Sequence, residues 1–190
     1  LTPHWLHPTM SAYRSACREI RRRGFECLSY GTTMRGELKE ILGLKTGLRT
    51  GWVRSGVKSP ESVAAHSWGM SMLALKLTPA NLDLQRVLSM CIVHDVPEVR
   101  VGDLTPHDDT STKTEDEHKA MQELAPEWVT LLEEYEQGQT LEAKFVKQLD
   151  KLDMALQAEI YQADQGISLE EFIESARKKI ADEELQSLLP

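Results

Sequence analysis

Two adjacent side chains that can bind a metal ion, His94 and Asp95, stand directly after an apolar stretch of the chain. This stretch, residues 87–93, has the composition of a buried segment, and polar groups at its end are costly to bury without a partner. Two further candidate ligands, His66 and Asp150, lie in other segments beside apolar residues. Two imidazoles and two carboxylates suit Mn, Fe, Co, Zn or Mg better than a metal that prefers thiolates. Together the four side chains predict a centre for one divalent metal ion.

Each of these residues has a simpler interpretation when it is taken alone. A histidine such as His66, on the apolar face of a helix, is usually a packed core residue, and a His-Asp dipeptide often arises by chance. Asp150, which follows the apolar Leu149, is alone typical of a solvated or salt-bridged carboxylate. The prediction of a metal centre therefore depends on the four residues acting together.

Two more carboxylates follow the His-Asp pair closely, at Glu98 and Asp103. One helical turn would bring Glu98 to the same side as the pair, and Asp103 follows Gly102 in a predicted loop. Carboxylates beside a metal ion suit hydrolysis, because one can orient or deprotonate the attacking water and the other can protonate the leaving oxygen. The alternative is a helix cap at Glu98 and a turn residue at Asp103.

The segments that carry these residues are predicted to be helical almost throughout. Apolar residues recur at helical spacing along most of the chain, and Pro126 should divide one long helical stretch in two. The predicted helical segments are 63–77, 84–92, 112–136, 141–163 and 169–189. A short extended piece is expected at 52–54, and neither a GxGxxG nor a P-loop motif occurs. The predicted fold class is therefore all-α, with one domain of about five to seven helices.

Composition limits the classes of protein to which the chain can belong. Its 190 residues are 41% hydrophobic and 27% charged, as in an ordinary globular domain, and the net charge is −8. That charge argues against a general binder of nucleic acid or of an anionic membrane. The three cysteines, at 17, 27 and 91, are too scattered for a disulfide framework or a zinc motif, and no run of 18 apolar residues occurs. We therefore expect a cytoplasmic protein without a membrane-spanning helix.

The first part of the chain differs in charge from the rest. Residues 1–34 contain five arginines and only two glutamates, whereas the remainder is acidic. We expect residues 1–35 to be an N-terminal extension, outside a domain at 36–188. An organellar targeting segment, which is typically rich in arginine and poor in acidic residues, is the alternative.

Several separate motifs occur one after another along the chain. They are RTGW at 49–52, PESVAAHS at 60–67, HDVPE at 94–98, GDL at 102–104 and EAKFVKQLDK at 142–151. Their order and spacing resemble the HD-domain superfamily of metal phosphohydrolases, and within it the compact 5′-deoxynucleotidase family. The resemblance covers roughly residues 36–188. It implies a single HD-domain helical bundle that removes the 5′-phosphate from deoxyribonucleoside monophosphates.

The resemblance also implies roles for individual residues. The implied metal ligands are His66, His94, Asp95 and Asp150. Glu98 matches an acidic residue that assists hydrolysis, and Asp103 matches a catalytic carboxylate near the nucleotide and its leaving oxygen. Arg49 matches a phosphate-binding arginine, which is reasonable because a guanidinium group contacts phosphate in a forked geometry. Trp52 is a looser match, with substrate binding and packing as its two possible roles.

The implied cofactor is one divalent metal ion, and the implied substrate is a deoxynucleotide. The resemblance further suggests a homodimer, with the last helices as a contact surface. Other reactions of the superfamily remain open, on nucleoside triphosphates, cyclic nucleotides or alarmones. A helical binding or regulatory module that keeps the fold without turnover is an alternative from a different class, although the intact ligand and acid positions favour an enzyme.

Overall fold

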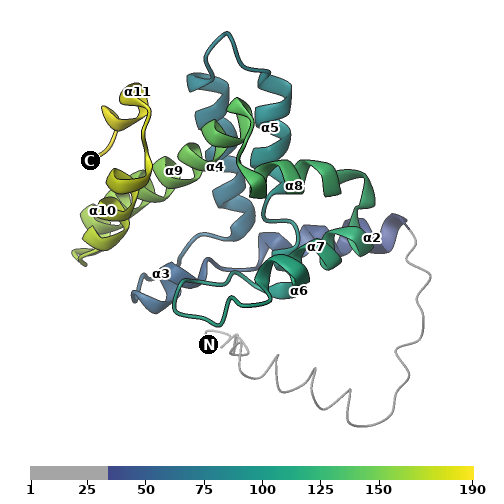
Figure 1. Ribbon diagram of the computed structural model, residues 1–190. Coiled ribbons are helices and arrows are strands. Elements are labelled where there is room, and N and C mark those ends of the chain that lie inside the picture. Colours follow the sequence, from purple (N-terminus) through teal and green to yellow (C-terminus); the bar gives the residue numbers. More distant parts are fainter. Residues whose placement is uncertain (1–33) are drawn as a thin grey trace, which may run out of the picture. The chain divides into compact units, whose positions relative to one another are not determined.

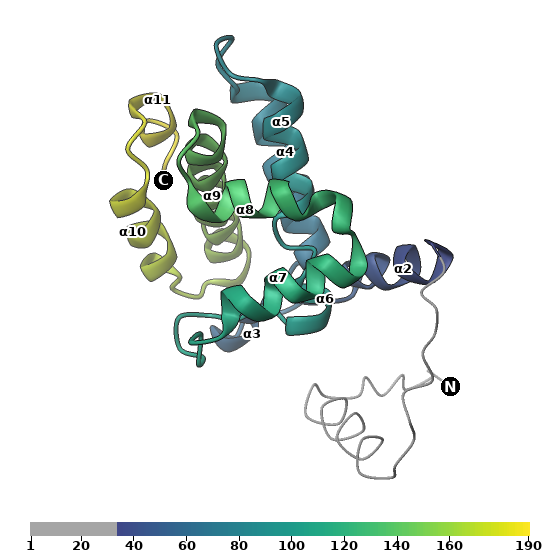
Figure 2. The same cartoon turned by 45° about the vertical axis from the view of Figure 1, so that its right-hand side comes forward.

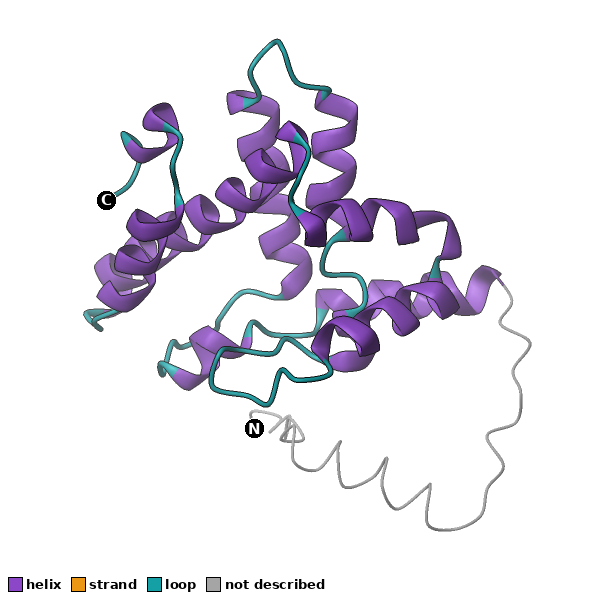
Figure 3. Cartoon of the chain, in the orientation of Figure 1, coloured by secondary structure: helices purple, strands orange, loops and turns teal. Residues whose placement is uncertain are grey.

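A computed structural model describes residues 34–190, so the expected extension at 1–35 lies almost entirely outside the described residues. Every regular element in the described part is a helix, and its only β-type pairing is an isolated bridge between Leu48 and Ser62 (Figure 3). The elements are α2 (Met34–Ile41), η1 (Leu42–Lys45), α3 (Thr50–Arg54), α4 (Val63–Leu77), α5 (Leu84–Val93), α6 (Glu98–Val101), α7 (Lys113–Leu124), η2 (Pro126–Trp128), α8 (Val129–Gln137), α9 (Leu141–Gln165), α10 (Glu170–Lys179) and α11 (Glu183–Gln186). Seven of the described α-helices have eight residues or more, and three are shorter. The all-α prediction is confirmed.

Short polar side chains begin the three helices that carry the candidate ligands. Ser62 caps α4, Asp83 caps α5 and Thr140 caps α9, each by accepting a hydrogen bond from the backbone N–H three residues later. Such caps satisfy N–H groups that have no partner inside the helix. At the other end of α9, Gly166 adopts the left-handed backbone conformation with φ of 66°, which favours glycine. These local signals fix where each helix begins or ends.

The three helices that carry candidate ligands, α4, α5 and α9, pack around one apolar cluster. Helices α4 and α5 form an antiparallel pair, and the long helix α9 packs against both (Figure 1). Helix α10 runs beside α9, α8 packs against both α5 and α9, and α7 packs against α6 and α8 (Figure 2). The fully buried residues of the cluster include Met70, Val87, Met90, Cys91, Val146, Leu149 and Leu152. The polar candidate ligands therefore come from helices that the main core holds in place.

Three local predictions were wrong. Residues 52–54 are not extended but form part of α3, because the side chain of Trp52 is buried among other aromatic rings and this packing outweighs the preference of such residues for strands. The last helix is interrupted after Lys179, where the side chain of Gln148 accepts hydrogen bonds from two backbone N–H groups and Asp182 caps α11. Ile92, which belongs to the apolar stretch 87–93 that has the composition of a buried segment, is 55% exposed. No helix within residues 34–190 has both the length and the apolar character needed to span a bilayer.

Candidate metal centre

Three of the predicted ligands meet where α4, α5 and α9 converge. His66 lies on the buried face of α4, His94 follows the last residue of α5, and Asp150 lies in the middle of α9. Their ligand atoms all lie within 4.8 Å of one another, and His66 Nε2 is 3.3 Å from Asp150 Oδ1. Nitrogen and oxygen donors lie about 2.0–2.2 Å from a bound transition metal, so atoms on opposite sides of one ion are about 4 Å apart. The three side chains are therefore spaced to bind one ion.

Asp95, the fourth predicted ligand, faces the same point. Its Oδ2 atom is 3.2 Å from His94 Nε2 and 3.8 Å from His66 Nε2. This oxygen and His66 Nε2 are both buried without a hydrogen-bond partner among the described residues, which is costly unless another group satisfies them. A divalent cation would satisfy both atoms, and a set of two nitrogens and two oxygens fits the chemistry of such an ion. The structure thus brings all four predicted ligands together.

The other ring nitrogen of each histidine is held by the protein. His66 Nδ1 lies 2.7 Å from Asp153 Oδ2, and His94 Nδ1 lies 3.1 Å from the backbone oxygen of Cys91. Such partners fix the ring orientation and leave Nε2 free to bind a metal. Sequence reasoning missed Asp153. Its position three residues after Asp150, on the same face of a predicted helix, was the signal available.

Neighbouring charges set the protonation of the ligands. Burial alone would raise the pKa of Asp95, but His94 and Arg49 outweigh it and hold the pKa of this carboxyl well below its usual range. Burial and the charge of Arg49 lower the pKa of His66, yet the neighbouring carboxylates of Asp150 and Asp153 raise it to about 9. A metal ion bound here would therefore meet ionised aspartates and would have to displace a proton from His66.

A guanidinium group lies next to the ligands. Arg49, the residue just before α3, donates a hydrogen bond of 3.0 Å to Asp103 Oδ1, and its Nη1 atom is 3.5 Å from Asp95 Oδ2. The backbone N–H of Thr50 donates to the second oxygen of Asp103. Although burial lowers the pKa of Arg49, the charges of Asp95 and Asp103 raise it, so the side chain is always cationic. Arg49 is thus a fixed positive charge at the edge of the ligand cluster, as expected for a phosphate-binding group.

Glu98 is the first residue of the short helix α6 and is buried. Its Oε2 atom has no hydrogen-bond partner among residues 34–190, and its Oε1 atom is 3.8 Å from the ammonium group of Lys113. Burial, reinforced by the charges of Asp95 and Asp103, raises the pKa of Glu98 to about 10. Lys113 also pairs with Glu117 at 3.3 Å and was not singled out from the sequence, because its distance of fifteen residues from Glu98 gives no local signal. Glu98 can therefore carry a proton beside the ligands.

Trp52 serves mainly as packing. Only 2% of the residue is exposed, and its ring lies 4.4 Å from that of Phe172 and 5.5 Å from that of Tyr161, between centroids. Its Nε1–H donates a hydrogen bond of 2.9 Å to Glu61. Trp52 is nevertheless one of the residues that line the cavity described next. Of the two roles left open for Trp52, these contacts favour packing.

A cavity of about 740 Å³ opens beside the ligands. This volume lies within the range typical of small-molecule sites. Its lining includes every predicted site residue except the buried His66: Arg49, Trp52, His94, Asp95, Glu98, Asp103 and Asp150. It extends beyond them to Met154 on α9 and to Phe172 on α10. The cavity therefore has room for a larger molecule than a phosphate ion.

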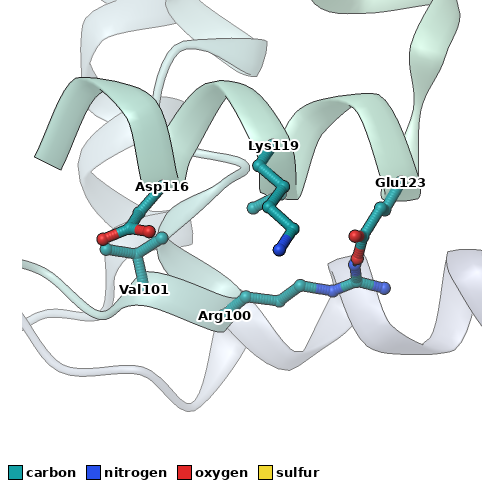
Figure 4. A pocket seen from close by; sticks show the side chains of 6 residues that line it. Arg100, Val101, Asp116, Lys119 and Glu123 are labelled. Atoms are coloured by element: carbon teal, nitrogen blue, oxygen red, sulfur yellow. The ribbon is translucent and has the colours of Figure 1, made fainter. Parts of the chain in front are cut away.

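A second hollow, between α6 and α7, shares no lining residue with the metal centre (Figure 4). Its volume is about 320 Å³, and its lining contains two cations, Arg100 and Lys119. The guanidinium of Arg100 donates a hydrogen bond of 2.6 Å to Glu123 and one of 2.7 Å to Glu40. The charge of Arg100 is therefore already paired with carboxylates.

Known proteins share both the sequence and this architecture. The HD domain family profile matches residues 41–188. The 5′-deoxynucleotidase HDDC2 of Danio rerio is 38% identical over 164 residues, which cover 80% of this chain and 82% of the relative. The 5′-deoxynucleotidase HDDC2 of Dictyostelium discoideum is 38% identical over 167 residues, covering 75% and 88% of the two chains.

Solved structures of other proteins are also similar to this chain in sequence and fold. A protein from Pyrococcus horikoshii is 31% identical and superposes with a TM-score of 0.69 over 80% of this chain and 98% of its own. A predicted metal-dependent phosphohydrolase from Magnetospirillum magnetotacticum is 25% identical, with a TM-score of 0.59 over 80% and 85% of the chains. The fold, the cluster of histidines and aspartates, and these similarities agree: the chain belongs to the HD-domain family and is a relative of its 5′-deoxynucleotidases.

Proposed function

We propose that the protein is a metal-dependent 5′-deoxynucleotidase, which hydrolyses deoxyribonucleoside monophosphates to deoxynucleosides and inorganic phosphate. The observation that carries this proposal is the convergence of a metal-binding cluster and the cationic Arg49 at one cavity. The cavity is also large enough to accept more than a phosphate ion. The curated relatives from Danio rerio and Dictyostelium discoideum, both named 5′-deoxynucleotidases, support the same substrate class.

The four side chains at the convergence of α4, α5 and α9 would hold one divalent ion, for which Mn, Co, Zn, Fe and Mg are the candidates. The ligands that we assign are His66, His94, Asp95 and Asp150. When bound, such an ion polarises a phosphoryl group and lowers the pKa of a bound water. Two observations support the assignment: the buried, unpaired ligand atoms and the partners that orient both imidazoles.

Arg49 would bind the phosphate oxygens, and Asp103 would hold Arg49 in place. The carboxylate of Asp103 already accepts hydrogen bonds from Arg49 and from the backbone of Thr50. Because both of its carboxylate oxygens are already held in this way, these contacts favour a substrate-positioning role over protonation of the leaving oxygen. Glu98 is the better group for proton transfer, at its unpaired Oε2 atom, because burial raises its pKa to about 10.

The remaining features of the proposal concern the whole protein. We propose that residues 36–188 form the catalytic domain and that the protein acts as a cytoplasmic homodimer that does not bind nucleic acid. The match of the family profile to residues 41–188 supports the domain limits, and the net charge of −8 supports the last point. Light scattering should give twice the mass of one 21.5 kDa chain.

Phosphate release from a panel of nucleotides tests the proposed activity. Protein freed of metal should be inactive, and added Mn or Co should restore release from deoxyribonucleoside monophosphates. Asp95→Ala should abolish activity without loss of helical content, whereas Asp164→Ala, at an exposed position of α9, should leave it unchanged. Turnover without metal, or faster hydrolysis of triphosphates or ribonucleotides than of deoxyribonucleoside monophosphates, would contradict the proposal.

A further inference from the structure

Helix α10 has two distinct faces. One face is buried against α9 and α3, and its residues are Leu169, Ile173, Ala176 and Ile180. The other face lines the cavity, and its residues are Ser168, Glu171, Phe172, Ser175 and Lys179. Within each set, most neighbouring members are three or four residues apart, which is the spacing that places side chains on one side of a helix. The apolar face therefore anchors α10 while the second face is presented to the cavity.

The polar side chains on the cavity face are free of protein partners. Glu171, Ser175 and Lys179 make no hydrogen bond or ion pair with any residue in the part of the chain that the structure describes. The acidic residues on the outer side of the same helix differ, because Glu170 and Glu174 both pair with Arg177. The cavity face thus offers both hydrogen-bond donors and acceptors to a molecule in the cavity.

An aromatic ring lies in the middle of this face, close to the phosphate-binding arginine. The ring of Phe172 packs on that of Trp52, and a Cβ atom added at Gly51 would lie 3.3 Å from its Cε1 atom. Gly51 is only two residues from Arg49, so their Cα atoms are at most about 7.6 Å apart. Phe172 therefore lies in the cavity within reach of a nucleotide whose phosphate contacts Arg49.

We propose that the cavity face of α10 contacts the base of the nucleotide and determines which deoxynucleotide is preferred; this inference rests on the proposed function. Phe172 supplies an apolar surface for the base, as aromatic side chains do in other nucleotide-binding sites. Glu171 accepts hydrogen bonds from exocyclic amino groups, which adenine, cytosine and guanine carry and thymine lacks. Ser175, one turn further along, can donate or accept and completes the contact.

Steady-state kinetics on the four deoxyribonucleoside monophosphates test the inference. Glu171→Gln should lower kcat/KM for the three substrates with amino groups relative to thymidine monophosphate, by about five-fold or more. Phe172→Ala should raise KM for all four substrates, and Phe172→Tyr, which keeps the ring, should restore it. Glu174→Gln, on the outer side of the same helix, is the matched control and should leave the ratios unchanged.

The possible outcomes separate the inference from the function on which it rests. If the unaltered protein hydrolyses deoxyribonucleoside monophosphates but Glu171→Gln changes their kcat/KM ratios no more than Glu174→Gln does, the base-contact inference is wrong and the proposed function stands. If the unaltered protein hydrolyses none of the four, both are wrong. Circular dichroism of each variant checks the fold, which an exposed position such as Glu171 should not disturb.

Discussion

The contact between Asp153 and the backbone of α4 leads to a specific prediction about metal binding. One carboxylate oxygen of Asp153 lies 2.7 Å from His66 Nδ1, and the other lies where a Cβ atom at Gly69 would approach to 2.2 Å. Because such contacts are essentially never shorter than 3.0 Å, Gly69→Ala requires the two groups to separate by about 0.8 Å. Movement of the carboxylate alone by that amount can lengthen the bond to His66 to about 3.5 Å, the limit of a useful hydrogen bond.

Both Gly69→Ala and Asp153→Asn should therefore weaken metal binding without removing a ligand. Loss of the partner that orients a metal-bound histidine typically costs 10- to 100-fold in affinity, which corresponds to about 1.4–2.7 kcal/mol. Gly69→Ala should weaken metal binding even though alanine favours a helix over glycine by about 1 kcal/mol. Asp164→Asn, which removes an exposed carboxylate from the same helix as Asp153, is the control.

Titration of the metal-free variants with Mn²⁺ in competition with a chelator measures the effect. We expect Asp153→Asn and Gly69→Ala to bind at least ten-fold more weakly than the control, with helical content preserved. If Asp153→Asn binds as tightly as Asp164→Asn, the carboxylate does not orient His66 and the reasoning fails. If only Gly69→Ala binds normally, the carboxylate moves at no cost to His66 and the steric part of the argument is refuted.

Three further predictions concern the groups around the centre. Arg49→Lys keeps the charge but loses the forked geometry, so kcat/KM for a deoxyribonucleoside monophosphate should fall about 10- to 150-fold; an unchanged value would exclude a direct phosphate contact. Trp52→Ala should lower the free energy of unfolding by about 3–5 kcal/mol in urea titrations, and a loss below 1 kcal/mol would contradict its buried packing. Glu134 accepts hydrogen bonds from Arg86 and Thr140. The pKa of its carboxyl group is lowered, and the largest cause is the hydrogen bond from Arg86. The ionised carboxylate of Glu134 therefore stabilises the fold above the unfolded pKa of about 4.3, and this stabilisation is lost as the pH falls through the lower folded pKa. The free energy of unfolding of Glu134→Gln should be lower than that of the unaltered protein at pH 7 and equal to it in acid. An equal difference at both pH values would disprove the assignment.

The helical pattern of the sequence placed His66 on an apolar face and Asp150 beside a buried leucine, but the grouping of the four ligands rested on the order and spacing of the motifs. The partners of the ligands were not predictable in the same way. The contact of Asp153 with His66 depends on the angle at which α9 crosses α4, and that of Lys113 with Glu98 depends on the loop after α6. Periodicity determines which face of a helix is buried but not which residue of another helix lies opposite.

The proposed metal ligands and the proposed nucleotide-binding residues are held by different parts of the apolar core. The metal ligands come from helices that pack around the main apolar cluster, so that Met70 lies one turn from His66 and Leu149 directly precedes Asp150. The groups that we assign to the nucleotide instead adjoin a second cluster, in which Trp52 packs with residues of α9 and α10. Because α9 contributes to both clusters, it would fix the distance between a metal ion held by the four ligands and a base in the proposed position. Substitutions in the main cluster should therefore weaken metal binding and stability together, whereas small changes in the second cluster should act on KM and base preference while metal affinity is retained.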